Sequence, residues 1–187
     1  MSEDSLGWKT LSQKYVLQDR WIRVRADVGQ MPSGQIIEPY YVLEYPNWAN
    51  VTAITPEREI VLVRQYRHAY GEAILELPGG GVDAGEPEME AVQRELLEET
   101  GYVGDKWEEI ARTSPNPANH NNLSISFLCL NAKRVAEQQL DTGEEIEVVL
   151  MPVEEVKQLL NENKIVQSMH VTSLFYAFRQ LEQLHIL

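Results

Sequence analysis

The chain alternates between stretches with the two-residue period of strands and stretches with the period of helices. From Trp8 to Tyr45, polar residues alternate with apolar or aromatic ones, and Pro32-Ser33-Gly34 interrupts the alternation. This pattern predicts antiparallel strands joined by a turn, as in a hairpin. Residues 60–63 are instead continuously apolar and rich in β-branched side chains. They predict a strand that is buried on both faces, at the centre of a sheet.

Helical signals appear in the second half of the chain. Pro87 opens a stretch that runs to Thr100, and Gly101 follows directly, which predicts a helix between the proline and the glycine. Further strands are expected at residues 51–55, 107–112, 123–130 and 146–151, and further helices at 153–161 and 171–184. This order of elements predicts a mixed α/β sandwich with helices packed against a sheet.

The length and the lack of internal boundaries indicate one domain. The chain has 187 residues, a size that one core commonly serves, and no internal repeat or Gly/Ser-rich linker divides it. We therefore expect a single domain over 1–187, with an N-terminal β region at 1–47 and the main core at 48–187.

Charge and composition exclude several classes of protein. Apolar residues make up 43% and charged residues 24%, which is typical of a soluble globular protein. Sixteen basic against 29 acidic residues give a net charge of −13, which argues against a nucleic-acid partner. The single cysteine cannot form an internal disulfide, and neither a signal peptide nor an apolar run of about 20 residues is present. A cytoplasmic protein without a membrane partner is the expectation.

The segment from residue 80 to 102 carries the candidate chemistry. Residues 86–99 contain six glutamates and one arginine. At about 100° per residue, Glu95, Glu98 and Glu99 share one face of the predicted helix, beside an apolar stripe. Clustered carboxylates suit a hard divalent cation, above all Mg²⁺, with Mn²⁺ as a substitute. The alternative interpretation is a solvated acidic face.

The spacing within this segment resembles the Nudix box, GX5EX7REUXEEXGU. All seven fixed letters are present, and Tyr102 replaces the last aliphatic residue; the matching positions are Gly80, Glu86, Arg94-Glu95-Leu96, Glu98-Glu99 and Gly101. Other segments look like the ADP-ribose and nucleoside diphosphate sugar pyrophosphatase branch of the family. They are Trp21 with Pro32-Ser33-Gly34, Arg64-Gln65-Tyr66-Arg67, Glu76-Leu77-Pro78-Gly79-Gly80 and Gly143-Glu144-Glu145-Ile146.

The resemblance implies a fold, an activity and partners. The fold would be the Nudix fold, a mixed α/β/α sandwich, with additional N-terminal antiparallel strands. The activity would be Mg²⁺-dependent hydrolysis of the pyrophosphate bond of ADP-ribose or a related nucleoside diphosphate sugar, giving a nucleoside monophosphate and a sugar phosphate. The partner would be that small molecule, and the N-terminal strands would build a homodimer.

The resemblance also implies roles for the acidic residues. The metal ligands would be Glu95, Glu99 and the Gly79 carbonyl, with Glu98 as a further ligand or the proton acceptor. Glu86 and Arg94 would pair and orient the others. A loop carboxylate, Glu144 or Glu145, would complete catalysis, and Glu144 is favoured because it matches the family's position.

Substrate contacts are implied for residues outside the box. Arg67 resembles the arginine that meets phosphates or the terminal ribose, and Trp21 resembles the aromatic residue that stacks on the base. Tyr40 is a further candidate. The loop at 114–122 carries asparagines where the branch has a glycine and an acidic residue, so Asn119 and His120 could bind a sugar, although a plain surface loop is the alternative.

Two other functions compete with this hypothesis. One is a sensing module with the Nudix fold that binds nucleotide sugars without turnover, although such a module would not need all four box glutamates. The other is a hydrolase of modified nucleoside triphosphates, which the N-terminal strands and the Arg64–Arg67 segment disfavour. His170 and Trp48 are interpreted as structural residues.

Overall fold

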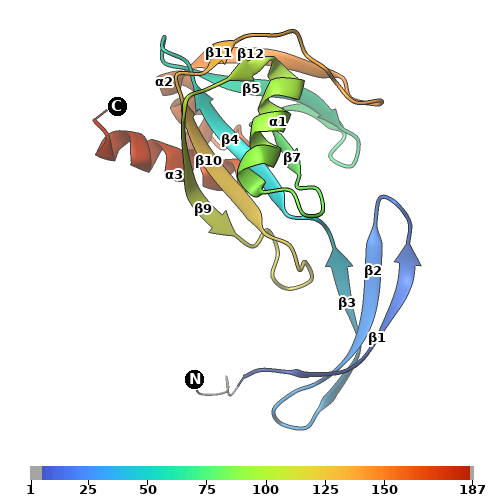
Figure 1. Ribbon diagram of the computed structural model, residues 1–187. Helices are drawn as coiled ribbons and strands as arrows, with labels where there is room; N and C mark the ends of the chain where they lie inside the picture. The colour runs from blue at the N-terminus through green and yellow to red at the C-terminus, as the bar shows by residue number, and fades with distance from the viewer. Residues whose placement is uncertain (1–5, 186–187) are drawn as a thin grey trace. The chain divides into compact units, whose positions relative to one another are not determined.

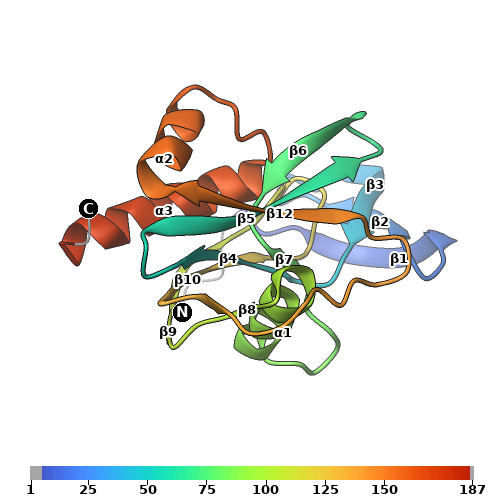
Figure 2. The ribbon, with the colours of Figure 1, turned by 90° about the horizontal axis from the view of Figure 1, so that it is seen from above.

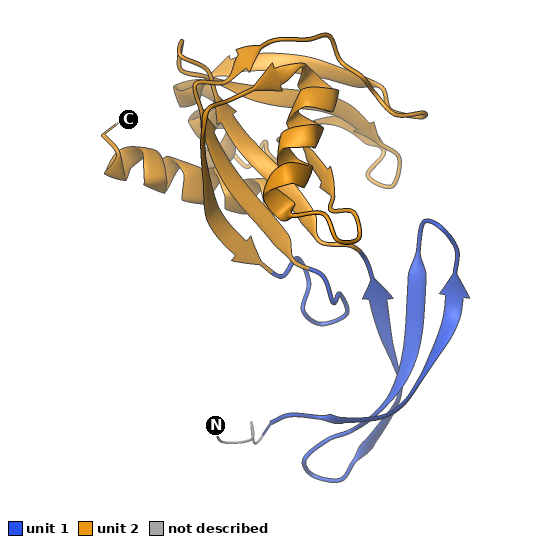
Figure 3. Ribbon diagram, viewed as in Figure 1, with its two compact units in different colours: residues 1–45, 114–122 blue, residues 46–113, 123–187 orange. Residues whose placement is uncertain are grey.

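The computed structural model describes residues 6–185 and divides into two compact units. Unit 1 takes the chain up to Tyr45 together with Ser114–Asn122, and unit 2 takes Pro46–Thr113 with Leu123–Leu187 (Figure 3). None of the helices within the described residues is long and apolar enough to cross a membrane.

Unit 1 is built on a three-stranded antiparallel sheet in the order β1-β2-β3. The strands are β1 (Lys9–Gln18), β2 (Arg23–Gln30) and β3 (Ile36–Glu44). The tight turn between β2 and β3 places Gly34 at φ 86°, and its N–H donates to the Met31 carbonyl at 2.8 Å. The predicted antiparallel strands and turn are confirmed, with three strands rather than one hairpin.

Unit 2 contains a seven-stranded mixed sheet with the order β12-β5-β4-β10-β9, in which β6 also pairs with β5 and β7 with β4. Its strands are β4 (Trp48–Ile54), β5 (Glu59–Arg67), β6 (Glu72–Glu76), β7 (Gly79–Gly81), β9 (Lys106–Thr113), β10 (Ser124–Leu130) and β12 (Ile146–Pro152); β8 (Tyr102–Val103) and β11 (Lys133–Arg134) form a separate pair. Residues 60–63 are buried in β5 as predicted. The prediction that these residues form the central strand is wrong, because β4 occupies the middle of the order β12-β5-β4-β10-β9.

Helices cover both faces of this sheet. Figure 2 shows α1 (Glu88–Thr100) on one side and α2 (Val153–Asn161) with α3 (Ser168–Gln183) on the other. One core joins Val92 and Leu96 of α1 to alternate residues of β4 and β10, and a second core joins α2 and α3 to the opposite face. This arrangement confirms the predicted mixed α/β/α sandwich with additional N-terminal antiparallel strands.

The ends of α1 follow the predicted signals closely. Pro87 lies at the N-cap position, one residue before the helix rather than inside it. Gly101 closes the helix in the left-handed conformation at φ 74°, and its N–H donates to the Leu97 carbonyl at 2.8 Å. Glycine adopts this conformation without the steric cost that other residues meet, so the helix ends there.

The sheet forks near its centre (Figure 1). The strands β4 and β5 pair only at Ala53 with Val61 and at Ile54 with Ile60. Beyond these pairs β4 continues beside β7, whereas β5 continues beside β6 and β12. Beyond residues 53 and 54, the strands β4 and β5 therefore belong to two separate branches of the sheet.

Candidate active site

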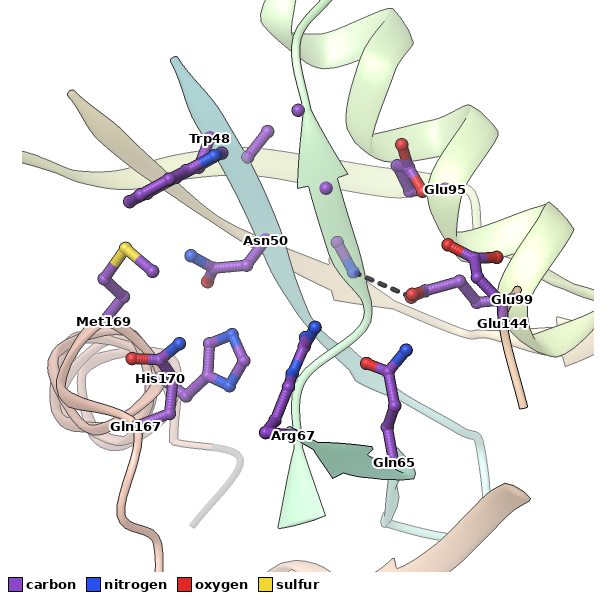
Figure 4. A pocket seen from close by; sticks show the side chains of 14 residues that line it. Trp48, Asn50, Gln65, Arg67, Glu95, Glu99, Glu144, Gln167, Met169 and His170 are labelled. Carbon is purple, nitrogen blue, oxygen red and sulfur yellow. Dashed lines mark hydrogen bonds between the residues drawn. The ribbon is translucent and has the colours of Figure 1, made fainter. Parts of the chain in front are cut away.

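A pocket of about 450 Å³ lies at this fork (Figure 4). Its walls come from β4, β5 and β7, from the acidic side of α1, from the start of α3 and from the loop before β12. Its polar lining includes Asn50, Arg67, Glu95, Glu99, Glu144 and His170. The fork therefore brings together side chains from both faces of the sheet.

Two glycines of β7 let the backbone approach this pocket closely. At Gly79, with φ 154°, an added Cβ would lie 2.2 Å from the Ala49 carbonyl oxygen. At Gly80, an added Cβ would lie 2.5 Å from a carboxylate oxygen of Glu95. A larger residue at position 79 would therefore push β7 away from the backbone of β4, whereas one at position 80 would displace the carboxylate of Glu95.

Glu99 and Glu95 carry carboxylates that burial has made hard to ionise. Glu99 is only 6% exposed, and its carboxylate accepts a hydrogen bond from the Gly79 N–H at 2.9 Å. Desolvation raises the pKa of Glu99 to about 8, and it also raises the pKa of Glu95. The neighbouring carboxylates of Glu95 and Glu144 add repulsion to Glu99. A cation in the pocket would relieve both effects.

Arg94 holds three of the predicted glutamates through ion pairs. Its guanidinium contacts Glu86 at 3.1 Å, Glu95 at 2.9 Å and Glu98 at 3.1 Å. The hydrogen bonds from Arg94 lower the pKa of Glu86, and Glu86 in turn accepts from the Asp83 N–H. Glu98 is half exposed and does not line the pocket. Arg94 thus fixes the orientation of the acidic face.

The residues present fit a hard divalent cation, although the fit is not preformed. Within residues 6–185, no three His, Cys, Asp or Glu side chains are gathered closely enough to hold a metal ion. The physical reason is visible in the contacts, because Arg94 holds Glu95 and Glu98 while Glu99 bonds to the backbone of β7. Glu95, Glu99 and Glu144 nevertheless line one pocket, and this set of oxygens matches the ligand preference of Mg²⁺.

The loop before β12 distinguishes its two neighbouring glutamates. Glu144 lines the pocket and accepts a hydrogen bond from the Asp141 N–H at 3.1 Å. Glu145 is exposed and does not line it. The structure thus brings Glu144, and not Glu145, to the carboxylates of α1.

Arg67 lies between His170 and the glutamates of α1 in Figure 4. It forms an ion pair at 2.7 Å with Glu76, which is 1% exposed. Close by, His170 accepts the Leu77 N–H at its Nδ1 atom, at 3.2 Å, and burial lowers the pKa of His170 to about 3. Figure 4 shows Arg67 and His170 next to each other, with Asn50 above them. This part of the pocket is therefore polar, and the buried Glu76 holds its arginine.

The other predicted substrate residues belong to unit 1 and do not line this pocket. Trp21 is 74% exposed, beneath the guanidinium of Arg20. The Tyr40 hydroxyl donates to the Ala118 carbonyl. The Asn119 carbonyl accepts from the Leu43 N–H at 2.7 Å, and the His120 ring contacts that of Tyr45. The loop at 114–122 is thus tied to β3.

Sequence reasoning missed several residues of the pocket. Trp48 and His170, which were interpreted as structural residues, line the pocket. Four residues without any predicted role line it as well: Asn50, Gln65, Gln167 and Met169. The available signal was weak: Asn50 is a polar residue within a buried strand, and His170 lies at the start of a helix that follows a polar stretch. Only the folded structure, in which both residues line one pocket, reveals a common site.

Two family models match the chain in adjacent segments. The model described as the NUDIX domain matches residues 46–170. The model described as the nucleoside diphosphate sugar hydrolase N-terminal domain matches residues 8–43. The first of these segments contains the pocket, and the second contains the sheet of unit 1.

Individual proteins are similar over most of the chain. An ADP-ribose pyrophosphatase of Bacillus subtilis (strain 168) is 26% identical over 162 residues, which is 86% of this chain and 87% of that protein. A methanol dehydrogenase activator of Bacillus methanolicus is 27% identical and covers 90% of this chain and 91% of its own. A crystal structure of an ADP compounds hydrolase shares the fold with a TM-score of 0.83 at 21% identity, covering 97% of this chain and 98% of that one.

Proposed function

Since the chain belongs to the Nudix family of hydrolases, we propose that it cleaves the pyrophosphate bond of ADP-ribose or a related nucleoside diphosphate sugar with Mg²⁺ bound. The products are a nucleoside monophosphate and a sugar phosphate. The observation that carries this proposal is the pocket at the fork, which combines glutamates at one end with neutral polar groups at the other. The similarity to ADP-ribose pyrophosphatases supports the same substrate class.

The metal ligands in this proposal are Glu95, Glu99 and the Gly79 carbonyl, with Glu98 as a further ligand or proton acceptor. Mg²⁺ held by these groups would supply positive charge to the pyrophosphate oxygens and to the leaving group. Arg94, itself held by Glu86, fixes the orientation of the Glu95 and Glu98 carboxylates through ion pairs. Without a cation, the carboxylates would repel an anionic substrate, so binding and cleavage have the same metal requirement.

Arg67 is the proposed contact for the phosphates or the adjoining ribose. Its guanidinium lines the pocket and is about half exposed, while the buried Glu76 holds it in place. A guanidinium fixed by one carboxylate keeps other N–H groups for a phosphate oxygen or a hydroxyl. Glu76 therefore acts as a positioning residue for Arg67.

We expect Glu144 to position the attacking water or accept its proton. Glu144→Gln should lower kcat about 100-fold with little change in KM, because the amide keeps the shape but loses the basic oxygen. Glu145→Gln is the matched control and should stay near the wild-type kcat. Steady-state kinetics of both variants at saturating Mg²⁺ decide the assignment. The reverse ranking would transfer the role to Glu145, and two near-normal variants would leave Glu98 as the base.

A homodimer through unit 1 is the proposed assembly. All ten residues of β1 are exposed, so neither face of this strand is covered in the single chain. Exposed large apolar residues of the unit are Leu6, Trp8, Leu11, Tyr15, Val16, Leu17, Trp21, Ile36, Tyr40 and Tyr41. An apolar strand of this kind normally pairs with a partner, and Trp21 could then stack on the base bound by the other copy.

Light scattering at micromolar concentration should give twice the mass of one chain. Leu17→Asp, on β1, should shift the protein toward the monomer, because it places a charge in the apolar surface. Val135→Asp is the control, since Val135 is similarly exposed but belongs to unit 2. A wild-type protein that is already monomeric would refute the dimer and any role of Trp21 across an interface.

A panel of substrates tests the proposed function against its rivals. Purified protein with Mg²⁺ would be given ADP-ribose, other nucleoside diphosphate sugars, dinucleoside polyphosphates and nucleoside triphosphates, and the products would be separated by chromatography. Preference for nucleoside diphosphate sugars is the expected result. Preference for triphosphates would favour the house-cleaning alternative, and binding without cleavage would favour the sensing module. A cytoplasmic location is the accompanying expectation.

A further inference from the structure

The end of the pocket away from α1 holds a small set of neutral polar side chains. In Figure 4 the glutamates Glu95, Glu99 and Glu144 lie on one side, and Asn50 and His170 lie toward the other. Asn50 is 4% exposed and His170 is 7% exposed, yet both line the pocket. Polar groups buried this deeply normally have a hydrogen-bond partner, so a polar atom that lacks one here is a candidate for binding a ligand.

The tautomer of His170 is fixed by its surroundings. Its Nδ1 atom accepts the Leu77 N–H at 3.2 Å and therefore carries no proton. Burial also keeps the ring neutral, because desolvation lowers its pKa to about 3. A neutral imidazole with a bare Nδ1 must carry its proton on Nε2. His170 thus presents a hydrogen-bond donor without a charge, and no described residue accepts from this atom.

Asn50 supplies the complementary acceptor. Its Oδ1 atom is buried and has no hydrogen-bond partner among residues 6–185, whereas its Nδ2 atom lies 3.4 Å from the Ser124 hydroxyl. A buried amide oxygen without a partner is costly unless a ligand satisfies it. Asn50 and His170 together therefore offer one acceptor and one donor at the same end of the pocket.

This pair matches a hydroxyl group better than a phosphate. A hydroxyl both donates and accepts hydrogen bonds, whereas phosphate oxygens only accept and require positive charge nearby. Neither Asn50 nor His170 is charged, and the cation beside them, Arg67, is already assigned to the phosphates or the adjoining ribose. We propose that Asn50 and His170 form a subsite that binds a hydroxyl of the sugar on the far side of the pyrophosphate from the nucleoside. This proposal rests on the proposed function.

The test compares two substrates that differ only in this sugar. ADP-ribose carries it, whereas the methyl ester of ADP on the β-phosphate keeps the pyrophosphate diester but has no terminal sugar. In His170→Asn, the amide oxygen can still accept the Leu77 N–H, but the donor toward the pocket is lost. We expect kcat/KM for ADP-ribose to fall about tenfold, mainly through KM, and kcat/KM for the methyl ester to change less than about twofold.

His170→Gln is the matched variant, because its longer amide can place an N–H near the position of Nε2. It should retain kcat/KM for ADP-ribose within about threefold of wild type. An equal loss of kcat/KM on both substrates in His170→Asn would mean that His170 contacts the shared ADP portion. No loss on either substrate would mean that His170 does not contact the substrate at all. Each of these two results overturns the subsite.

A measurement on the unmodified protein keeps the proposal testable if a variant fails to fold. Nitrogen NMR of histidine-labelled protein should show His170 as the Nε2–H tautomer, and its Nε2 signal should move with the uncleavable α,β-methylene analogue of ADP-ribose. An Nδ1–H tautomer or an unmoved signal would refute the subsite. Failure of the wild-type protein to cleave any nucleoside diphosphate sugar would instead refute the proposed function, before any variant is compared.

Discussion

EDTA is expected to abolish hydrolysis of the best nucleoside diphosphate sugar, leaving less than about 1% of the activity, and excess Mg²⁺ should restore it. The reason is electrostatic. The pocket gathers Glu95, Glu99 and Glu144, and burial raises the pKa of Glu95 and Glu99, so these carboxyl groups ionise fully only beside a cation. Without that cation, nothing on the α1 side of the pocket would offset the charge that develops on a pyrophosphate as it is cleaved.

The measurement is product formation by chromatography in dialysed protein, with EDTA and then with Mg²⁺ in measured excess. EDTA already saturated with Mg²⁺ is the control for effects of the chelator itself. Mn²⁺ should also restore activity, because it accepts the same oxygen ligands. Hydrolysis that continues at full rate under chelation would contradict both the metal requirement and the proposed role of the α1 glutamates.

Glu99→Gln is expected to lower kcat about 1,000-fold or more, equivalent to about 4 kcal/mol of transition-state stabilisation. Glu99 is the most buried of the three helix carboxylates and is held by the Gly79 N–H at 2.9 Å. The glutamine side chain has the same shape and can keep this hydrogen bond, so the fold should remain. What it loses is the negative charge that a metal ligand provides.

Glu90→Gln is the matched control, since Glu90 lies on the same helix but is exposed and does not line the pocket. Its kcat should stay within about twofold of wild type. Circular dichroism and the thermal midpoint of both variants would verify that the fold is kept. If Glu99→Gln reduced kcat by less than about tenfold, Glu99 would belong to a solvated acidic face rather than to a metal site.

The sequence predicted those parts of the fold that depend on local periodicity. The helix at 153–161 has the predicted bounds, and α1 ends at the predicted glycine. The strand at 60–63 is buried as its continuous apolar character indicated. Strands that depend on tertiary partners were less visible: β6 and β7 are short, and β7 consists of three glycines that carry no hydrophobic pattern.

The candidate site shows the same division. The Glu95, Glu98 and Glu99 face follows from helical geometry, and so could be predicted from spacing alone. Arg94 then orients two of these residues, but the position of Glu98 outside the pocket could not be read from the spacing. His170 and Asn50 line one pocket only because β4 and α3 converge there, and proximity between positions so distant in the sequence leaves no local pattern.

The two ends of the pocket are built from different elements of the fold. The carboxylates come from α1 and the loop before β12, whereas the neutral donor and acceptor come from α3 and β4. Substitutions at independent positions usually have additive effects. If the proposed function holds, changes near the start of α3 would therefore alter the sugar preference while the carboxylates of α1 stay unchanged.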